Sequence, residues 1–318
     1  MVVAAGDTAH RPLRVPPSFV HCHSAVGHNR HVSRRTRTPE PQWRRRLSTG
    51  AVAEIVPDPY SPDGFELRVD GTAQSHVYRE HPDELFFEYM QRIAHLIDAA
   101  AAAREPMTAL HLGAGALSIP RYVAATRPGS RQQVVEFEPA LVELVREALP
   151  LPRDASIRIR YGDARETLGH LPSGLRGHID VIVVDVFSGA RTPAHVTSAE
   201  FFEQLRDLLS PTGVVITNAA DGDALRFVRS QAATLRYVFP HVLATAEPGV
   251  LKGRRFGNVV FQAGATSVDR ARLARQMASG PFPTTVLADA ELDRFSAGAT
   301  VVTDAAAVMS PPPPKGLF

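Results

Sequence analysis

The chain has 318 residues, of which 44% are hydrophobic and 21% charged, enough for one large domain or for a domain with an appendage. No apolar run approaches the ~20 residues of a membrane-spanning helix, so we exclude an integral membrane protein. The single cysteine, Cys22, excludes an internal disulfide and a cysteine-cage metal site. It suits a reducing compartment, so we expect a cytoplasmic protein without a metal.

The first 50 residues carry nine arginines against only Asp7 and Glu40, although the formal net charge of the whole chain is +2. They show no period of 2 or 3.6, and a segment without an apolar face to bury cannot offset the entropy cost of ordering. We therefore expect residues 1–50 to be a disordered basic tail. Such a tail attracts any polyanion, so it predicts no specific nucleic-acid partner.

Residues 51–80 change to short alternating runs, which are typical of strands. The runs lie at 53–56, 65–69 and 75–78, with a turn signal at Asp70-Gly71. This pattern predicts a small N-terminal β-meander that forms its own domain.

Residues 83–103 carry apolar side chains at the 3–4 spacing of one buried helix face. Strand-like and helix-like segments then alternate for about 150 residues, as in a parallel sheet covered by helices on both faces. The expected strands are 109–112, 133–137, 157–161, 181–185 and 214–217, followed by a terminal hairpin at 242–245 and 258–262. The expected helices are 117–126, 139–148, 198–209 and 223–237, with Ser198 and either Asp221 or Asp223 as N-caps.

These elements predict an α/β domain over residues 81–285 and a C-terminal extension over 286–318. In an open parallel sheet, the ligand lies outside the carboxyl ends of the strands. The residues that follow each strand are therefore the candidates for a site.

The first two strands end in residues that suit a nucleoside. A turn containing Gly113 and Gly115 follows the first strand, and its missing side chains let a ligand approach the backbone. The second strand ends at Glu136, where an acid could hold a ribose diol, while Glu138 could be an ordinary acid at a helix N-terminus. Ser118 stands where the third glycine of a dinucleotide fingerprint would fall, so the pattern favours S-adenosylmethionine-type nucleosides.

The next two strands also end in acids. Asp163, followed by Ala164, could accept a hydrogen bond from an adenine amino group or simply cap the helix that follows. Asp185 lies at the tip of a strand that is otherwise apolar. The predicted fold is thus a class I S-adenosylmethionine methyltransferase-like, Rossmann-like, mostly parallel sheet behind a small β-meander.

A series of motifs runs through residues 53–263. They are Gln74, Asp83-Glu84, 113–116, 135–138, 162–164, 185–188, Phe201-Phe202 and 209–214. On these motifs the chain resembles the spermidine synthase (polyamine aminopropyltransferase) family. The resemblance implies a transferase of an alkyl group other than methyl, and the resembled family commonly dimerises, which leaves a homodimer open.

The resemblance also implies roles for residues. The co-substrate would be a sulfonium nucleoside, decarboxylated S-adenosylmethionine or S-adenosylmethionine itself. Its nucleoside would be held by Gln74, Gly113, Gly115, Glu136, Asp163 and Ala164. Asp185 would be the base that takes a proton from the attacking amine.

The departures from the family fall on the acceptor side. Ala116 and Ser188 replace two acids, and Phe87 replaces a tyrosine. The loop that closes over the polyamine in the family carries Lys252, Arg254 and Arg255 here. A buried cation needs carboxylates, so we expect a small-molecule acceptor other than a simple diamine. The alternative is that the basic loop is a solvated surface turn.

Two other functions stay open. One is methyl transfer from S-adenosylmethionine, and the other is a non-catalytic nucleoside-binding protein on the same fold. His76, His111 and His195 receive no role, because isolated histidines are more often structural residues.

Overall fold

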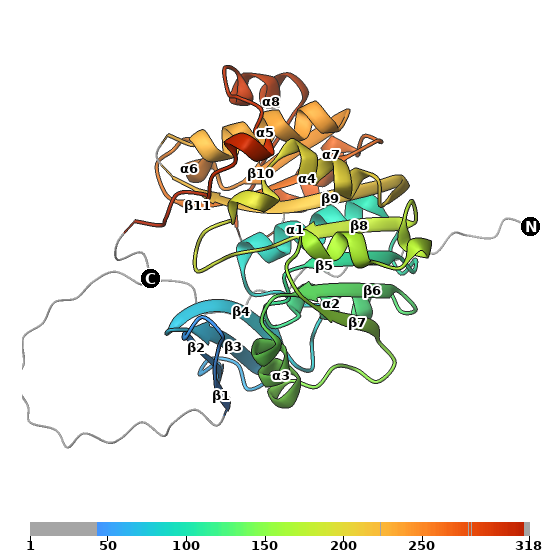
Figure 1. The fold of residues 1–318 in the computed structure, drawn as a ribbon, viewed down its shortest axis with the longest axis vertical. Coiled ribbons are helices and arrows are strands. Elements are labelled where there is room, and N and C mark those ends of the chain that lie inside the picture. Colours follow the sequence, from blue (N-terminus) through green and yellow to red (C-terminus); the bar gives the residue numbers. More distant parts are fainter. Residues whose placement is uncertain (1–42, 223, 279, 281, 315–318) are drawn as a thin grey trace, which may run out of the picture.

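The computed structural model describes residues 43–222, 224–278, 280 and 282–314, which form two sheets (Figure 1). The smaller sheet is antiparallel, in the order β1-β2-β3-β4. Its strands are β1 (Trp43–Arg46), β2 (Val52–Pro57), β3 (Gly64–Val69) and β4 (Thr72–Tyr78). Along β2, Ala53 and Ile55 are buried while Glu54 between them is not, the period of two that gives a sheet one apolar face.

The larger sheet has the order β12-β10-β11-β9-β8-β5-β6-β7. Its strands are β5 (Thr108–Leu112), β6 (Arg131–Glu136), β7 (Ser156–Tyr161), β8 (Ile179–Val184), β9 (Leu209–Asp221), β10 (His241–Ala246), β11 (Gly257–Gly264) and β12 (Thr285–Ala288). The pairs from β9 through β8, β5 and β6 to β7 are parallel, and β11, β10 and β12 add antiparallel pairs. The predicted Rossmann-like, mostly parallel sheet with an N-terminal meander is confirmed.

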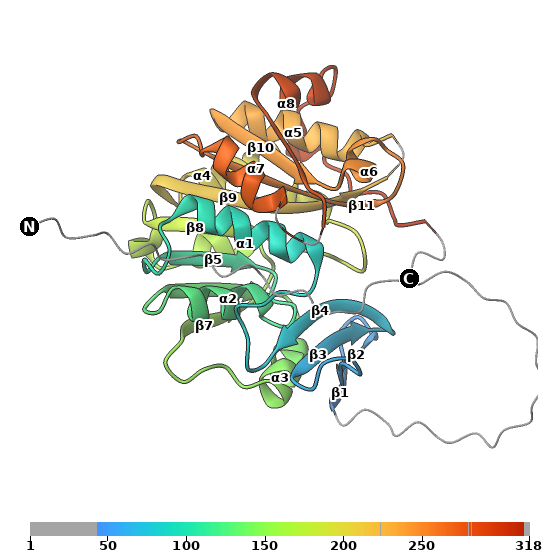
Figure 2. The same ribbon diagram turned by 180° about the vertical axis from the view of Figure 1, so that it is seen from behind.

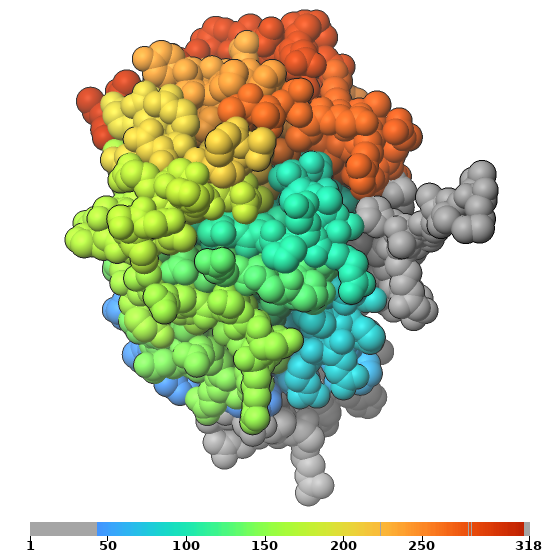
Figure 3. All heavy atoms as spheres, turned by 90° about the vertical axis from the view of Figure 1, so that its right-hand side faces the viewer, coloured from blue at the N-terminus to red at the C-terminus, as the bar shows by residue number. Residues whose placement is uncertain are grey.

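Helices cover both faces of this sheet. They are α1 (Glu88–Ala100), α2 (Ser118–Thr126), α3 (Pro139–Ala148), α4 (Ala199–Arg206), α5 (Arg226–Val238), α6 (Pro248–Leu251), α7 (Arg270–Ala278) and α8 (Asp289–Ser296). Short 3-10 helices lie at Glu166–His170, Ser173–Leu175, Ala194–Val196 and Asp304–Ala306. Figure 2 shows α1 and α7 on one face, where the two helices contact each other. In Figure 3, the N-terminal sheet lies at the opposite end of the molecule from the C-terminal helices.

Strand β8 shows why the central strands read as continuous apolar runs. Ile182 and Val184 pack into the core on the α4–α5 side, whereas Val181 and Val183 pack into the core on the α1–α7 side. Because both faces of the strand are buried, its sequence shows no alternation of apolar and polar residues.

The predicted helix caps are partly confirmed. The hydroxyl of Ser198 accepts a hydrogen bond from the Phe201 N–H at 3.2 Å and so caps α4. Asp221 accepts from the Val228 N–H at 3.0 Å inside α5, but Leu225 is the residue before that helix. Asp223 lies outside the described residues.

The prediction of disorder for residues 1–50 is wrong at its C-terminal end, because β1 pairs with β2 there. Trp43 packs edge-on against Phe65, with 6.2 Å between ring centroids. Arg45 pairs with Glu143 and Glu147 of α3 at 3.0 and 2.8 Å. Partners distant in sequence stabilise this basic strand, and a four-residue strand is too short to show a period. Residues 1–42 of the predicted tail lie outside the described residues.

The predicted boundary before residue 286 is also wrong. β12 pairs with β10 and extends the large sheet, and α8 packs against α5. The chain then returns along the domain, where the Val302 carbonyl accepts a hydrogen bond from the Ala199 N–H at 2.8 Å. The extension is therefore part of the main domain.

None of the helices in the described ranges is both long and apolar enough to cross a bilayer.

Candidate active site

The glycine turn after β5 makes close backbone contacts with the neighbouring strands. Gly113 has a φ of +91° and donates its N–H to the Val135 carbonyl at 2.9 Å. A Cβ at Gly113 would collide with the backbone oxygen of Asp185, and one at Gly115 would lie 2.9 Å from Ser75 Oγ. Only glycine fits either position, so the turn presents bare backbone next to Asp185 and β4.

Glu136, at the end of β6, holds the same turn. Its Oε2 accepts the Ala114 N–H at 2.8 Å, and its Oε1 accepts the Glu138 N–H at 2.9 Å. Burial raises the pKa of Glu136, and the amide donors oppose that shift. The Phe137 N–H is a third donor to this carboxylate, which has about four lone-pair sites and can therefore still accept from a ligand. Glu138 instead accepts the Ser48 N–H at 3.0 Å and thereby joins the N-terminal sheet to the large domain.

Asp163 is largely occupied by local contacts. Its Oδ1 accepts the N–H groups of Arg165 and Glu166 at 2.8 and 3.1 Å, which caps the following 3-10 helix. Its Oδ2 lies 2.8 Å from His195 Nε2. Burial acts to raise the pKa of Asp163, but the amide donors and His195 outweigh it and lower the pKa. These bonds agree with the capping alternative, although Arg165 is the residue directly before the 3-10 helix, and both alternatives for Asp163 stay predictions. An adenine at Oδ2 would compete with His195.

Asp185 directly follows β8 and is held from two sides. Its N–H donates to the Leu112 carbonyl at 2.9 Å, and its Oδ1 accepts from Asn218 Nδ2 of β9 at 2.9 Å. Burial raises the pKa of Asp185 to about 6, although the Asn218 hydrogen bond acts to lower it. A carboxylate with such a pKa can accept a proton near neutral pH.

Asn218 and Tyr89 are site residues that the sequence reasoning missed. Asn218 is 2% exposed, and its Oδ1 has no hydrogen-bond partner in the described part of the chain. Burial, and then the charge of Asp185, raise the pKa of Tyr89 in α1, so this phenol lies near Asp185. An asparagine inside the apolar strand β9 is a signal that could have been noticed, whereas Tyr89 follows the spacing of an ordinary buried helix face.

The remaining predicted nucleoside residues lie in different settings. Gln74 is the extra residue of a β-bulge in β4, where the register passes from Ser75 to Ala73, and it is half-buried. Its neighbour Ser75 is the residue that faces Gly115, so β4 reaches the glycine turn. Ala164 is 7% exposed and packs into the core, so its side chain is structural.

The residues that depart from the family on the acceptor side lie in different settings. Ala116 is buried in an apolar core, and Phe87 stacks on Tyr89 with 6.2 Å between centroids. Arg255 pairs with Glu247 at 2.8 Å and with Glu88 at 3.6 Å. The other departed residues, Ser188, Lys252 and Arg254, are exposed. Two acids therefore neutralise Arg255, whereas Lys252 and Arg254 agree with the alternative of a solvated surface turn.

The three histidines all have partners. His76 contacts Asp58 at 3.0 Å and His111 contacts Gln132 at 2.8 Å, while His195 contacts Asp163. Burial lowers the pKa of His111 to about 4, which keeps this ring neutral. Among the described residues, no group of three or more His, Cys, Asp or Glu side chains is arranged to hold a metal ion.

No family model matches the chain. Among curated proteins, it is 28% identical over 175 residues to a polyamine aminopropyltransferase of Vibrio vulnificus (strain CMCP6), which covers 55% of this chain and 56% of that protein. The match thus spans little more than half of that relative's length. An eEF1A lysine and N-terminal methyltransferase of Danio rerio is 27% identical over 160 residues, which are 48% of this chain and 23% of that protein.

Among solved structures, the chain is similar to a probable spermidine synthase from Corynebacterium glutamicum ATCC 13032. The two are 33% identical with a TM-score of 0.74, and the match covers 82% of this chain and 95% of that one.

Proposed function

Because the chain belongs to the spermidine synthase (polyamine aminopropyltransferase) family as a divergent member, we propose that it transfers an aminopropyl group from decarboxylated S-adenosylmethionine to an amine. The observation that carries this proposal is the pair formed by Asp185 and Asn218. A carboxylate with a pKa of about 6 lies at a strand tip, beside a buried amide oxygen that has no donor among the residues described. An attacking amine supplies the N–H groups that both require.

The reaction needs a nucleophile with a free lone pair. Asp185 takes a proton from the amine, whose nitrogen then attacks the methylene carbon next to the sulfonium sulfur. The new C–N bond forms as the C–S bond breaks, and the bonding electrons leave with sulfur as methylthioadenosine. Asn218 acts as a positioning residue, because its Nδ2 orients Asp185 while its Oδ1 accepts a second N–H from the amine.

The nucleoside would lie over the glycine turn. Gly113 and Gly115 expose backbone there, and Glu136 lies at the neighbouring strand end with lone pairs for a ribose diol. Gln74 approaches from β4, and Asp163 with Ala164 closes the adenine end once His195 releases the carboxylate. These roles are proposals that rest on strand-end positions and on the family motifs.

We further propose that the acceptor is not a simple diamine. The buried Ala116 stands in the glycine turn at the position where the family has an acid. The carboxylates of Glu88 and Glu247 are already paired with Arg255. A second ammonium group would therefore find little compensation for leaving water. We expect a monoamine to be converted at least tenfold more efficiently than putrescine. Comparable kcat/KM values for the two would contradict this.

Calorimetric titration of the full chain with decarboxylated S-adenosylmethionine and, in parallel, S-adenosylmethionine tests the co-substrate. We expect the decarboxylated form to bind more tightly, with Glu136→Gln weakening both. Tighter binding of the carboxylated form would instead favour methyl transfer, which the similarity to a methyltransferase keeps as a second candidate. Binding without turnover on any amine would indicate a non-catalytic nucleoside-binding protein. A cytoplasmic location stays a prediction from the sequence.

A further inference from the structure

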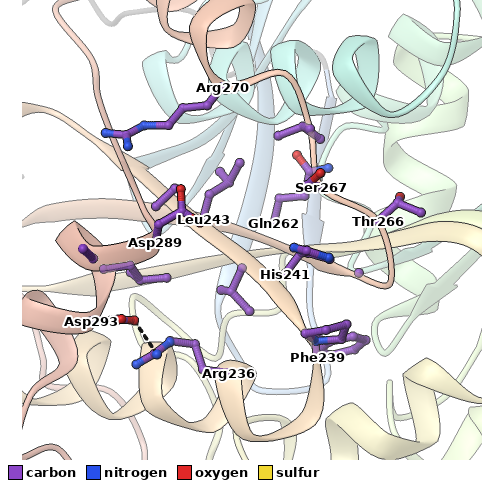
Figure 4. A pocket seen from close by; sticks show the side chains of 17 residues that line it. Arg236, Phe239, His241, Leu243, Gln262, Thr266, Ser267, Arg270, Asp289 and Asp293 are labelled. Carbon is purple, nitrogen blue, oxygen red and sulfur yellow. Dashed lines mark ion pairs between the residues drawn. The ribbon is translucent and has the colours of Figure 1, made fainter.

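A cavity lies at the edge of the large sheet that is opposite Asp185, and Figure 4 shows the side chains that line it. β10 begins where antiparallel β11 ends, so His241 pairs with Gly264, and the cavity surrounds these two residues. The opposite end of β11 pairs with Asp221, at the edge where Asp185 lies. The cavity has a volume of about 420 Å³, within the range of small-molecule pockets.

Gln262 is a buried polar group in the wall of this cavity. It lies in β11 directly between Leu243 of β10 and Ile216 of β9, two apolar residues of the core on the α1–α7 side. Its side chain is 3% exposed, and its Oε1 has no hydrogen-bond partner among the residues that the structure describes. A buried carbonyl oxygen without a donor is unfavourable, so this atom is available to accept a hydrogen bond from a molecule in the cavity.

The arginines of the cavity are already neutralised. Arg236 forms an ion pair with Asp293, drawn in Figure 4, and donates to Ser296 Oγ at 3.2 Å. Arg270, at the other end of the cavity, forms an ion pair with Glu291. Neither guanidinium therefore calls for an anionic ligand.

Asp289 supplies a further acceptor. It lines the cavity, is exposed, and has no ion pair within the described ranges. Its φ of +47° is a left-handed conformation that a residue with a side chain rarely adopts. The cavity thus offers a buried amide oxygen and a carboxylate, both of which accept hydrogen bonds, beside the polar side chains of His241, Thr266 and Ser267.

We propose that this cavity binds a small molecule carrying a primary ammonium group. The ammonium donates to Gln262 Oε1, and Asp289 balances its charge. This site is separate from the proposed transferase site and does not depend on aminopropyl transfer.

The test is an NMR titration of the ¹⁵N-labelled full chain with n-butylamine, using 1-butanol as the neutral probe of the same shape. An Asp185→Asn background removes the proton acceptor of the other site. We expect the amine to shift the side-chain amide signal of Gln262 in this background, while the alcohol does not. Equal effects of both probes, or no effect of the amine, would overturn the proposal.

Three variants locate the site. Gln262→Leu should weaken amine binding at least tenfold, and Asp289→Asn, which also tolerates the left-handed backbone, at least fivefold. Asp154→Asn removes an exposed carboxylate elsewhere and should leave the affinity unchanged. If Gln262→Leu does not fold, the Asp289→Asn titration decides alone. Wild-type affinity in the variants that fold would refute the site.

Discussion

The proposed reaction depends on how a few side chains are positioned by hydrogen bonds. Asp185 is a carboxylate with a raised pKa, Asn218 orients it, and Glu136 fixes the glycine turn beside it. Glu136 and Asp185 lie at the ends of strands and Asn218 lies inside the neighbouring strand β9, so the rigid backbone of one sheet determines their positions.

Replacing Asp185 by asparagine keeps the shape of the side chain and removes the proposed base. We expect kcat to fall by 10²- to 10⁴-fold, as for the loss of a general base. In the wild type, kcat/KM should rise with pH up to about 6 and then level off, because only the ionised form accepts a proton. A pH–rate profile without this limb would contradict the role of Asp185.

The same substitution should not destabilise the protein at pH 7 to 8. Because the folded pKa of Asp185 is raised to about 6, the folded state holds its proton more tightly, and stability falls as pH rises through that range. Asp185→Asn removes this penalty, on the order of 3 kcal/mol. Urea unfolding of both proteins at pH 7.5 measures it, and a markedly less stable variant would show that the carboxylate has a structural role.

Asn218→Ala should shift the pH–rate profile. The hydrogen bond from Nδ2 lowers the pKa of Asp185, so its loss should move the acidic limb to higher pH and reduce kcat. Asn218→Gln should restore part of the shift if its longer amide reaches Asp185. An unchanged profile with reduced stability alone would assign Asn218 a purely structural role.

The elements that position these residues are held together by close backbone contacts. The turn after β5 passes between β6 and β8 with no room for a side chain at Gly113, and β4 closes it at Gly115. This packing, more than the conformational freedom of glycine, determines which residue can stand there.

A pair of glycine variants separates the two effects. Gly113 and Gly50 have φ values of +91° and +87°, but a Cβ at Gly50 would meet nothing within 4 Å. Gly50→Ala should cost about 1 kcal/mol for the backbone alone, and Gly113→Ala roughly 2 to 4 kcal/mol. Chemical denaturation measures both, and equal losses would show that the turn can shift away from Asp185.

At the scale of the whole molecule, β1 and the segment 304–310 both pack against the main domain. β1 completes the N-terminal sheet and packs on α3, and Glu138 accepts a hydrogen bond from Ser48 in the loop after β1. At the other end, Asp304 pairs with Arg165, and the Ser310 N–H donates to the Thr192 carbonyl at 3.1 Å in the loop that follows Asp185.

Removal of β1 should therefore destabilise the protein. We expect a chain of residues 51–318 to be less stable than one of 43–318 by about 2 to 4 kcal/mol, because the partly buried Trp43 and Leu47 lose their contacts. Denaturant midpoints of the two chains give the difference. Equal midpoints would restore residue 51 as the domain start.

The order of strands and helices, the glycine turn and the acids at strand ends follow from local patterns, because periodicity and turn chemistry act over a few residues. On this basis the fold was predictable, as were the positions of Glu136, Asp163 and Asp185. The sequence also carried the family motifs, several of which lie at the same strand ends.

Other features depend on contacts between segments far apart in the sequence. Asn218 of β9 donates a hydrogen bond to Asp185 at the end of the neighbouring strand β8. Arg255 forms an ion pair with Glu88 of α1, and His195 contacts the Asp163 carboxylate. β1 forms a strand by pairing with β2 and contacts α3 through Arg45, and Gln262, between β9 and β10, has an Oε1 without a partner among the described residues. Burial, pairing and the pKa of Asp185 are properties of such contacts, so only the tertiary structure decided them.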